Sequence, residues 1–158
     1  GSASSGTVIY SNNYLNWTLA SSVLATTELN DVVFFNNQYF AIGNAGVIVS
    51  SPNGNNWVYV PQTLTTVNLN SIACNGALCM LVGNSGIVLK TSTGWSWTTQ
   101  ASGTTLDLMA MASNGNFFQF VGKGNVSSYY DAITLTRRAM TNVTTSSPTN
   151  NLLAIIPE

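Results

Sequence analysis

Apolar and polar residues alternate along short segments of this chain, and the pattern recurs with a period of about 40 residues. Each copy opens at a leucine and closes at a glycine: Leu29 and Gly43, Leu69 and Gly83, Leu108 and Gly122. The separation between the leucine and the glycine is identical in all three copies. Alternation with a period of two predicts β-strands, and nothing in the unit has the period of a helix.

A second repeated phrase lies next to these segments. It reads GTVIYSNNYLNW at residues 6–17, GVIVSSPNGNNW at 46–57 and GIVLKTSTGWSW at 86–97. With the Gly/Asn turns between them, the two phrases predict four short strands per unit, in the second complete copy residues 69–75, 78–82, 87–90 and a fourth opened by Trp97. A unit of four antiparallel strands in about 40 residues is typical of a propeller blade, so we predict an all-β fold, a β-propeller of four-stranded antiparallel blades. We expect Trp17, Trp57 and Trp97 to pack between blades.

The segment Ser51-Pro52-Asn53-Gly54-Asn55-Asn56-Trp57 resembles the Asp-box (BNR-like) hairpin, whose pattern is Ser-x-Asp-x-Gly-x-Thr-Trp or Ser-x-Asp-Gly-x-x-Trp. The wider unit is similar to propeller repeats of photosystem assembly factors, bacterial surface proteins and phage tail proteins. The resemblance covers roughly residues 6–126. The family aspartate is replaced by Asn13, Asn53 and Thr93, and the glycine by Tyr14 in the first copy. Because the Asp-box is a structural hairpin in that family, these departures concern turn stability.

The repeats predict one propeller domain over residues 6–158, after a tag or linker at residues 1–5. It comprises a partial blade at 6–20, blades at 28–60 and 68–100, a degenerate blade at 107–138, and a lone strand at 151–157. These strands fall just short of four blades. Three explanations fit: the tail closes the ring onto the N-terminal pair, the chain is a fragment, or copies form a homo-oligomer. Open sheet edges favour the last.

Charged residues make up 6% of the chain, and its net charge is −1. Nucleic-acid binding needs clustered Lys and Arg, which this sequence lacks, so we predict no nucleic-acid partner. No apolar run approaches the length of a membrane span, so we predict no membrane insertion. A surface built from Asn, Thr, Ser and Gly is common in extracellular and virion-surface β proteins, which is the location we expect.

The chain has no histidine and two cysteines, Cys74 and Cys79. Zinc sites of the Cys/His kind and His-dependent nucleophilic catalysis therefore lack their ligands and base. We predict no metal, no cofactor and no enzymatic activity. A glycosidase using Asp31 or Asp107 is the least favoured alternative. The two cysteines flank a tight hairpin within reach of a disulfide, and either a disulfide or two reduced core thiols fits.

Ligand-binding candidates are few. Trp95 lies in a polar turn where its counterparts are Leu15 and Asn55, so it could stack on a sugar or contact a protein. Further candidates lie in the degenerate blade and in three equivalent turns: Tyr129, Tyr130, Asn44, Asn84 and Lys123. We predict a binding module for a cell-surface glycan or a protein receptor. The alternative is a structural or assembly protein whose blades contact other subunits.

Overall fold

A computed structural model of the chain describes residues 6–20 and 27–140. The predicted tag at 1–5 and the predicted lone strand at 151–157 lie outside the described residues. Within the described ranges, no helix is long and apolar enough to cross a membrane. The regular structure of these residues consists of strands, as the alternating pattern predicts, and three short 3₁₀ turns.

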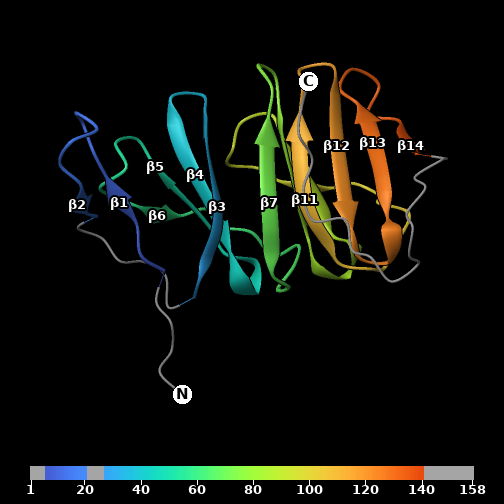
Figure 1. The fold of residues 1–158 in the computed structure, drawn as a ribbon, viewed down its shortest axis with the longest axis horizontal. Helices are drawn as coiled ribbons and strands as arrows, with labels where there is room; N and C mark the ends of the chain where they lie inside the picture. The colour runs from blue at the N-terminus through green and yellow to red at the C-terminus, as the bar shows by residue number, and fades with distance from the viewer. Residues whose placement is uncertain (1–5, 21–26, 141–158) are drawn as a thin grey trace.

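The strands form three four-stranded antiparallel sheets and one two-stranded sheet (Figure 1). We call the two-stranded sheet the half-blade and the others the first, second and third blades. The half-blade pairs β1 (Ile9–Tyr10) with β2 (Thr18–Leu19). The first blade comprises β3 (Leu29–Phe35), β4 (Gln38–Gly43), β5 (Ile48–Ser51) and β6 (Val58–Tyr59). The second comprises β7 (Leu69–Cys74), β8 (Cys79–Gly83), β9 (Val88–Thr91) and β10 (Thr98–Thr99). The third comprises β11 (Leu108–Ser113), β12 (Phe117–Gly122), β13 (Ser127–Asp131) and β14 (Arg137–Ala139).

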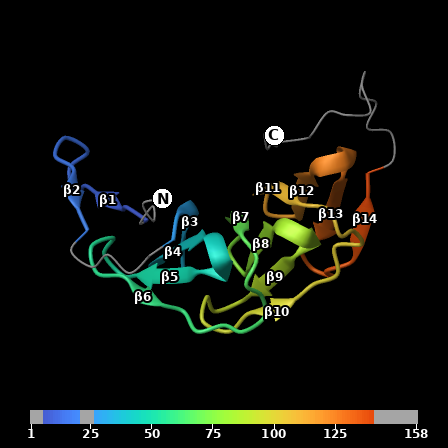
Figure 2. The ribbon, with the colours of Figure 1, turned by 90° about the horizontal axis from the view of Figure 1, so that it is seen from below.

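The sheets follow one another around an arc, and the first strands β3, β7 and β11 lie on its concave side (Figure 2). Within each blade the strands pair in chain order. Successive blades therefore present sheet faces to each other, and the apolar residues of facing strands form the core.

Turn chemistry explains the pairing within a blade. Asn36 and Asn37 have φ values of 48° and 59°, which matches the tight turn that the sequence predicts between β3 and β4. Between the second and third strands of each blade lies a 3₁₀ turn: η1 (Asn44–Gly46), η2 (Asn84–Gly86) and η3 (Lys123–Asn125). A β-bulge near the start of the first strand recurs in all three blades, between Leu29 and Asp31 in the first.

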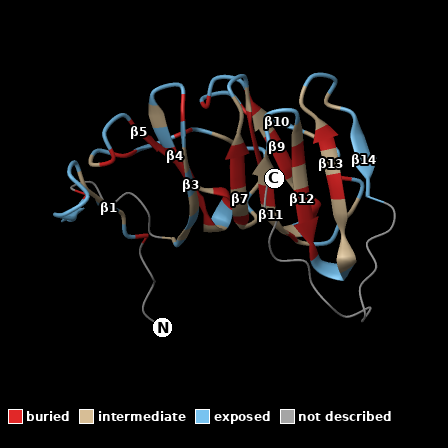
Figure 3. Cartoon of the chain, turned by 45° about the horizontal axis from the view of Figure 1, so that its top comes forward, coloured by how far each residue is buried: buried red, intermediate tan, exposed pale blue. Residues whose placement is uncertain are grey.

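Much of the strand surface of the second and third blades is buried (Figure 3). Large apolar side chains fill the two interfaces between complete blades. Phe40 and Ile42 of the first blade pack with Leu81 and Trp97 of the second. Met80 and Val82 of the second blade pack with Phe118 and Phe120 of the third, in a buried cluster that also contains Tyr130. The buried tryptophan of the second blade, Trp97, thus faces the preceding blade.

The predicted burial of the repeat tryptophans holds for two of three. Trp57 and Trp97 are 5% and 7% exposed, and their Nε1–H groups donate to the carbonyls of Gly54 and Gly94. Trp17 is 59% exposed, so its predicted burial is wrong. The reason is its place in the array, because no described residue forms a blade on the far side of the half-blade.

Candidate binding site at the half-blade

The half-blade contains only the third and fourth strands of the repeat unit. By the period of the repeat, β1 corresponds to β5 and β9, and β2 to β6 and β10. No described strand occupies the place of the first two strands. The face of the first blade that such strands would cover is consequently open.

This opening leaves apolar side chains of the first blade in solvent. Val32 is 55% exposed, whereas the equivalent Ile72 and Met111 are 4% and 7% exposed. Phe34 and Tyr39 are also exposed and pack against each other, with ring centroids 4.9 Å apart. Exposed apolar groups gathered on one face mark a surface that binds another molecule more often than isolated ones do.

The inner edge of β1 is also open. Ile9 pairs with Leu19 of β2 on one side. The equivalent Val49 and Leu89 pair on their other side with Ala41 and Leu81, from the second strands of their blades. In the described part of the chain, β1 has no such neighbour, and Ile9 is 57% exposed. An unpaired strand edge is a template for adding another strand.

Two hollows of about 270 Å³ each adjoin this edge. Both are lined by Val8, Ile9, Val32 and Trp57, and one extends to Asp31 while the other reaches Tyr39. The open edge, the exposed apolar residues and the two hollows together form what we call the half-blade site. It is apolar with a backbone edge along one side, the chemistry that suits an extended peptide.

The acidic side chain that lines one of the hollows, Asp31, already accepts hydrogen bonds from neighbouring residues. One carboxylate oxygen of Asp31 accepts hydrogen bonds from the Ile72 N–H at 2.9 Å and the Ser71 hydroxyl at 3.0 Å. The other accepts from the Val32 N–H at 2.8 Å. Asp31 therefore joins the first blade to the second and is not presented to a ligand as a bare carboxylate.

Asp107, at a different position of the repeat, similarly joins the second blade to the third. It forms an ion pair with Lys123 at 2.7 Å and accepts a hydrogen bond from the Ser85 N–H at 3.0 Å. The Lys123 hydrogen bond, followed by that of Ser85, holds the pKa of Asp107 below its ordinary value. Among the described residues, no three His, Cys, Asp or Glu side chains are grouped so that they could hold a metal ion.

The side chains of the predicted turn residues also form hydrogen bonds within and between turns. The Asn44 side chain accepts a hydrogen bond from Asn30 at 3.0 Å and donates one to Glu28 at 3.2 Å. Asn84 accepts from Asn70 at 2.9 Å. With the Lys123 ion pair, all three predicted side chains stabilise turns and blade contacts. Their role in ligand binding stays a prediction.

The aromatic candidates have different surroundings. Trp95 is 44% exposed, and its ring meets Phe40 edge-on with centroids 6.2 Å apart. Tyr129 is partly buried and packs edge-on against Phe117 at 5.3 Å. Tyr130 has no exposed surface, and its hydroxyl donates to the Ala101 carbonyl at 2.6 Å. The expectation that Tyr130 contacts a ligand is therefore corrected, because its side chain belongs to the core.

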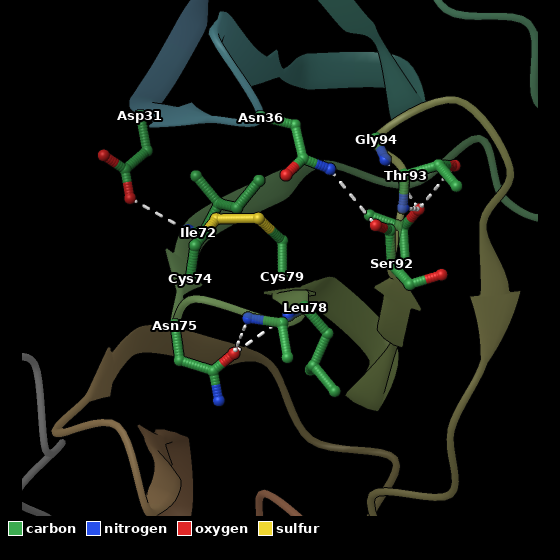
Figure 4. Close-up of a disulfide and its surroundings, with 12 residues drawn as sticks. Asp31, Asn36, Ile72, Cys74, Asn75, Leu78, Cys79, Ser92, Thr93 and Gly94 are labelled. Carbon is green, nitrogen blue, oxygen red and sulfur yellow. Dashed lines mark hydrogen bonds between the residues drawn. A yellow bond between two sulfur atoms is a disulfide. The ribbon is translucent and has the colours of Figure 1, made fainter.

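Cys74 and Cys79 form a disulfide across the β7–β8 hairpin, with Cα atoms 4.0 Å apart (Figure 4). They are directly opposite in the strand register. Asn75 caps the same turn, since its side-chain oxygen accepts hydrogen bonds from the N–H groups of Ala77 and Leu78. The disulfide occupies the position that Phe34 and Tyr39 hold in the first blade.

Sequence reasoning did not single out Ile9, Val32, Phe34 and Tyr39. The repeat alignment nevertheless points to them, because all four residues adjoin the place of the two strands that are not found in the first unit. Strand counting alone identified the incomplete blade. Identifying the uncovered residues requires knowing which face of a blade meets the preceding one, and the structure supplies that.

Comparisons with known proteins support the fold. No family model matches the chain, and no curated protein matches it. Among solved structures, one described as "YCF48 bound to D1 peptide" is similar, with a TM-score of 0.62 and 16% sequence identity. The similarity covers 72% of this chain and 40% of that chain. Together with the sheet topology, it shows that the chain has a β-propeller fold.

Proposed function

We propose that this chain is a non-enzymatic protein-binding module that takes up an extended segment of a partner protein at the half-blade site. The observation that carries the proposal is the open inner edge of β1 beside the exposed side chains of Val32, Phe34 and Tyr39. Added strands gain main-chain hydrogen bonds along the edge and bury alternate side chains in apolar hollows. The similar structure was solved with a bound peptide, which supports the same class of ligand.

The proposal is tested with short synthetic peptides of alternating valine and threonine, with a lysine at each end for solubility. We expect saturable chemical-shift changes at the backbone amides of Ile9, Val32 and Tyr39. The binding should be lost in Val32→Asp, which alters a side chain that is already more than half exposed. Ile133→Asp is the matched control, since Ile133 is an exposed apolar residue of the third blade, outside this site. The proposal would be wrong if the peptides caused no chemical-shift changes, or caused equally strong changes in Val32→Asp.

Glycan binding is the second candidate function, supported by the exposure of Trp95 in a turn rich in hydroxyl and amide groups. A glycan array probed with the chain and with Trp95→Ala tests it. Binding that the substitution abolishes would support a lectin-like role. No binding across the array would contradict the glycan candidate and favour the protein-binding proposal.

An extracellular or virion-surface location is part of the same proposal. It is supported by the Cys74–Cys79 disulfide, since disulfides are typical of oxidising compartments. Alkylation of the protein from its native source, followed by mass spectrometry, tests it. Recovery of both cysteines as free thiols would contradict the location.

A further inference from the structure

We infer that the partner segment is a β-hairpin of the same kind as the hairpin formed by the first two strands of each complete blade, with a leucine at its start and a glycine at its end. The inference rests on the proposed function and specifies the partner that the half-blade site accepts. Each complete blade of this chain begins with such a hairpin, and the separation between its leucine and its glycine is the same in every blade. Among the described residues, this is the part of the unit that the half-blade does not contain.

The complete blades show what covers the equivalents of the exposed residues. Ile72 is buried against Phe40 and Ile42, which belong to the second strand of the first blade. Met111 is likewise buried against Met80 and Val82, from the second strand of the second blade. Val32 occupies the equivalent position and is exposed, since the half-blade has no second strand. In the complete blades, the face that buries these residues therefore belongs to the hairpin of the preceding blade's first two strands.

The edge of β1 fixes how the hairpin is oriented. In complete blades the second strand pairs antiparallel with the third, as Leu81 pairs with Leu89. Ile9 is the equivalent of Leu89, so the second strand of the incoming hairpin would pair with it. The first strand of the hairpin would then lie on the concave side, beside β3, as β7 lies beside β3 in this chain (Figure 2).

The glycine at the end of the hairpin is a packing requirement. A Cβ atom on Gly43 would lie 2.1 Å from the Glu28 carbonyl oxygen, and one on Gly83 would lie 2.2 Å from that of Asn68. Such distances are far inside van der Waals contact, so the turn forms only without a side chain. The same contact recurs at Gly122, where the distance is 2.3 Å. The partner hairpin needs this glycine to close in the same way.

The face of the hairpin toward the first blade should be apolar and uncharged. Asp31 is the one acidic residue that lines the two hollows, and its oxygens already accept three hydrogen bonds. Unpaired charge buried there would have no counterion. Val32, Phe34 and Tyr39 instead offer apolar surface, as Met111 and Phe118 do in the third blade.

We assign the hairpin to a partner protein, because the three inner hairpins that the structure describes are held in their own blades. In the described chain, the second strands of the three inner hairpins, β4, β8 and β12, are already paired with the third strands of their own blades, β5, β9 and β13. A second copy could donate one of these three hairpins only by breaking the strand pairing of its own blade. A protein with an uncommitted hairpin loses no core contacts when it binds.

The probe is a synthetic peptide with the sequence of residues 68–83, oxidised so that its two cysteines hold the hairpin closed. Preorganisation of this kind lowers the entropy that binding costs. Titration calorimetry with the full chain should show saturable binding of one peptide per chain. A peptide carrying Gly83→Val should bind at least tenfold more weakly. The chain with Val32→Asp should also bind the parent peptide at least tenfold more weakly, while Ile133→Asp should bind it normally.

The outcomes separate this inference from the proposed function. Binding of the valine–threonine peptides without binding of the hairpin peptide would overturn the hairpin and leave strand addition standing. Failure of both probes would overturn both. Equal affinity for the parent peptide and its Gly83→Val version would also overturn the inference. So would light scattering that shows dimers held by this face, broken by Val32→Asp and unaffected by the peptide, because the occupant would then be a second copy.

Discussion

The aromatic ring of Phe40 in the first blade lies directly against the main chain of Gly94 in the second. A Cβ atom on Gly94 would lie 2.0 Å from the ring carbon Cζ of Phe40. Gly94 is the glycine of the repeated hairpin turn, and its φ is +86°. Two requirements thus meet at one residue: a left-handed backbone and room for the side chain of the preceding blade.

Replacing Gly94 with alanine should strongly destabilise the fold. The left-handed backbone costs about 1–2 kcal/mol for a non-glycine residue, and overpacking against Phe40 adds about 1–3 kcal/mol. We expect urea denaturation to show a free energy of unfolding lower by about 3 kcal/mol when both effects act together. Gly115→Ala is the matched control, because Gly115 has a φ of +92° and no atom near the added Cβ. It should show the backbone cost alone, and equal losses in both variants would refute a packing role for Gly94.

A second prediction concerns a hydrogen bond that ties adjacent blades together. The Asn70 side chain donates to the Leu108 carbonyl at 2.6 Å, and Asn30 makes the same bond to the Leu69 carbonyl at 2.7 Å. Asn70→Leu should leave that carbonyl without its donor and cost about 1–3 kcal/mol. Met109 is the equivalent residue of the third blade, and Met109→Leu should change the free energy of unfolding little. Thermal denaturation of the two variants compares them directly, and equal losses would contradict a joining role for Asn70.

The repeat made most of the fold predictable. Alternation placed the strands, Gly and Asn placed the turns, and the regular recurrence of the unit identified the blades. In the repeated hairpin turn, the side-chain oxygens of Asn53 and Thr93 both accept hydrogen bonds from N–H groups of their own turns. These features are local, so neighbouring residues in the sequence determine them.

The candidate site was less predictable because it depends on contacts between units. Trp17 carries the same repeat signature as Trp57, yet Trp57 packs in a cluster that includes half-blade residues, whereas no described residue forms a blade beyond Trp17. Tyr130 of the degenerate blade was a predicted ligand contact, but its strand directs it into the core beside Phe120, with ring centroids 5.5 Å apart. A repeat pattern records which residue occupies a position and not whether a neighbouring blade is present.

Reducing the disulfide should lower stability without unfolding the chain. The Cys74–Cys79 bridge closes a loop with a sequence separation of 5, for which the loop-closure entropy corresponds to about 2 kcal/mol. We expect urea denaturation to shift to lower concentration when a reductant is added. The double variant Cys74→Ala and Cys79→Ala should be insensitive to the reductant. A reductant effect of equal size in that variant would place the sensitivity elsewhere.

The buried hydroxyl of Tyr130 should make stability depend on alkaline pH. Burial raises the pKa of Tyr130 from 10.0 to about 12. The unfolded chain therefore loses this proton at a lower pH than the folded chain, and folding is penalised as pH rises from about 10 towards 12. The free energy of unfolding should fall by up to about 2 kcal/mol over this interval because of Tyr130. Tyr130→Phe is less stable at neutral pH, since the Ala101 carbonyl loses its donor, but it should lack this part of the alkaline loss. Urea denaturation at pH 9 and at pH 11.5 measures the difference, and parallel losses in both proteins would show that Tyr130 does not titrate with a raised pKa.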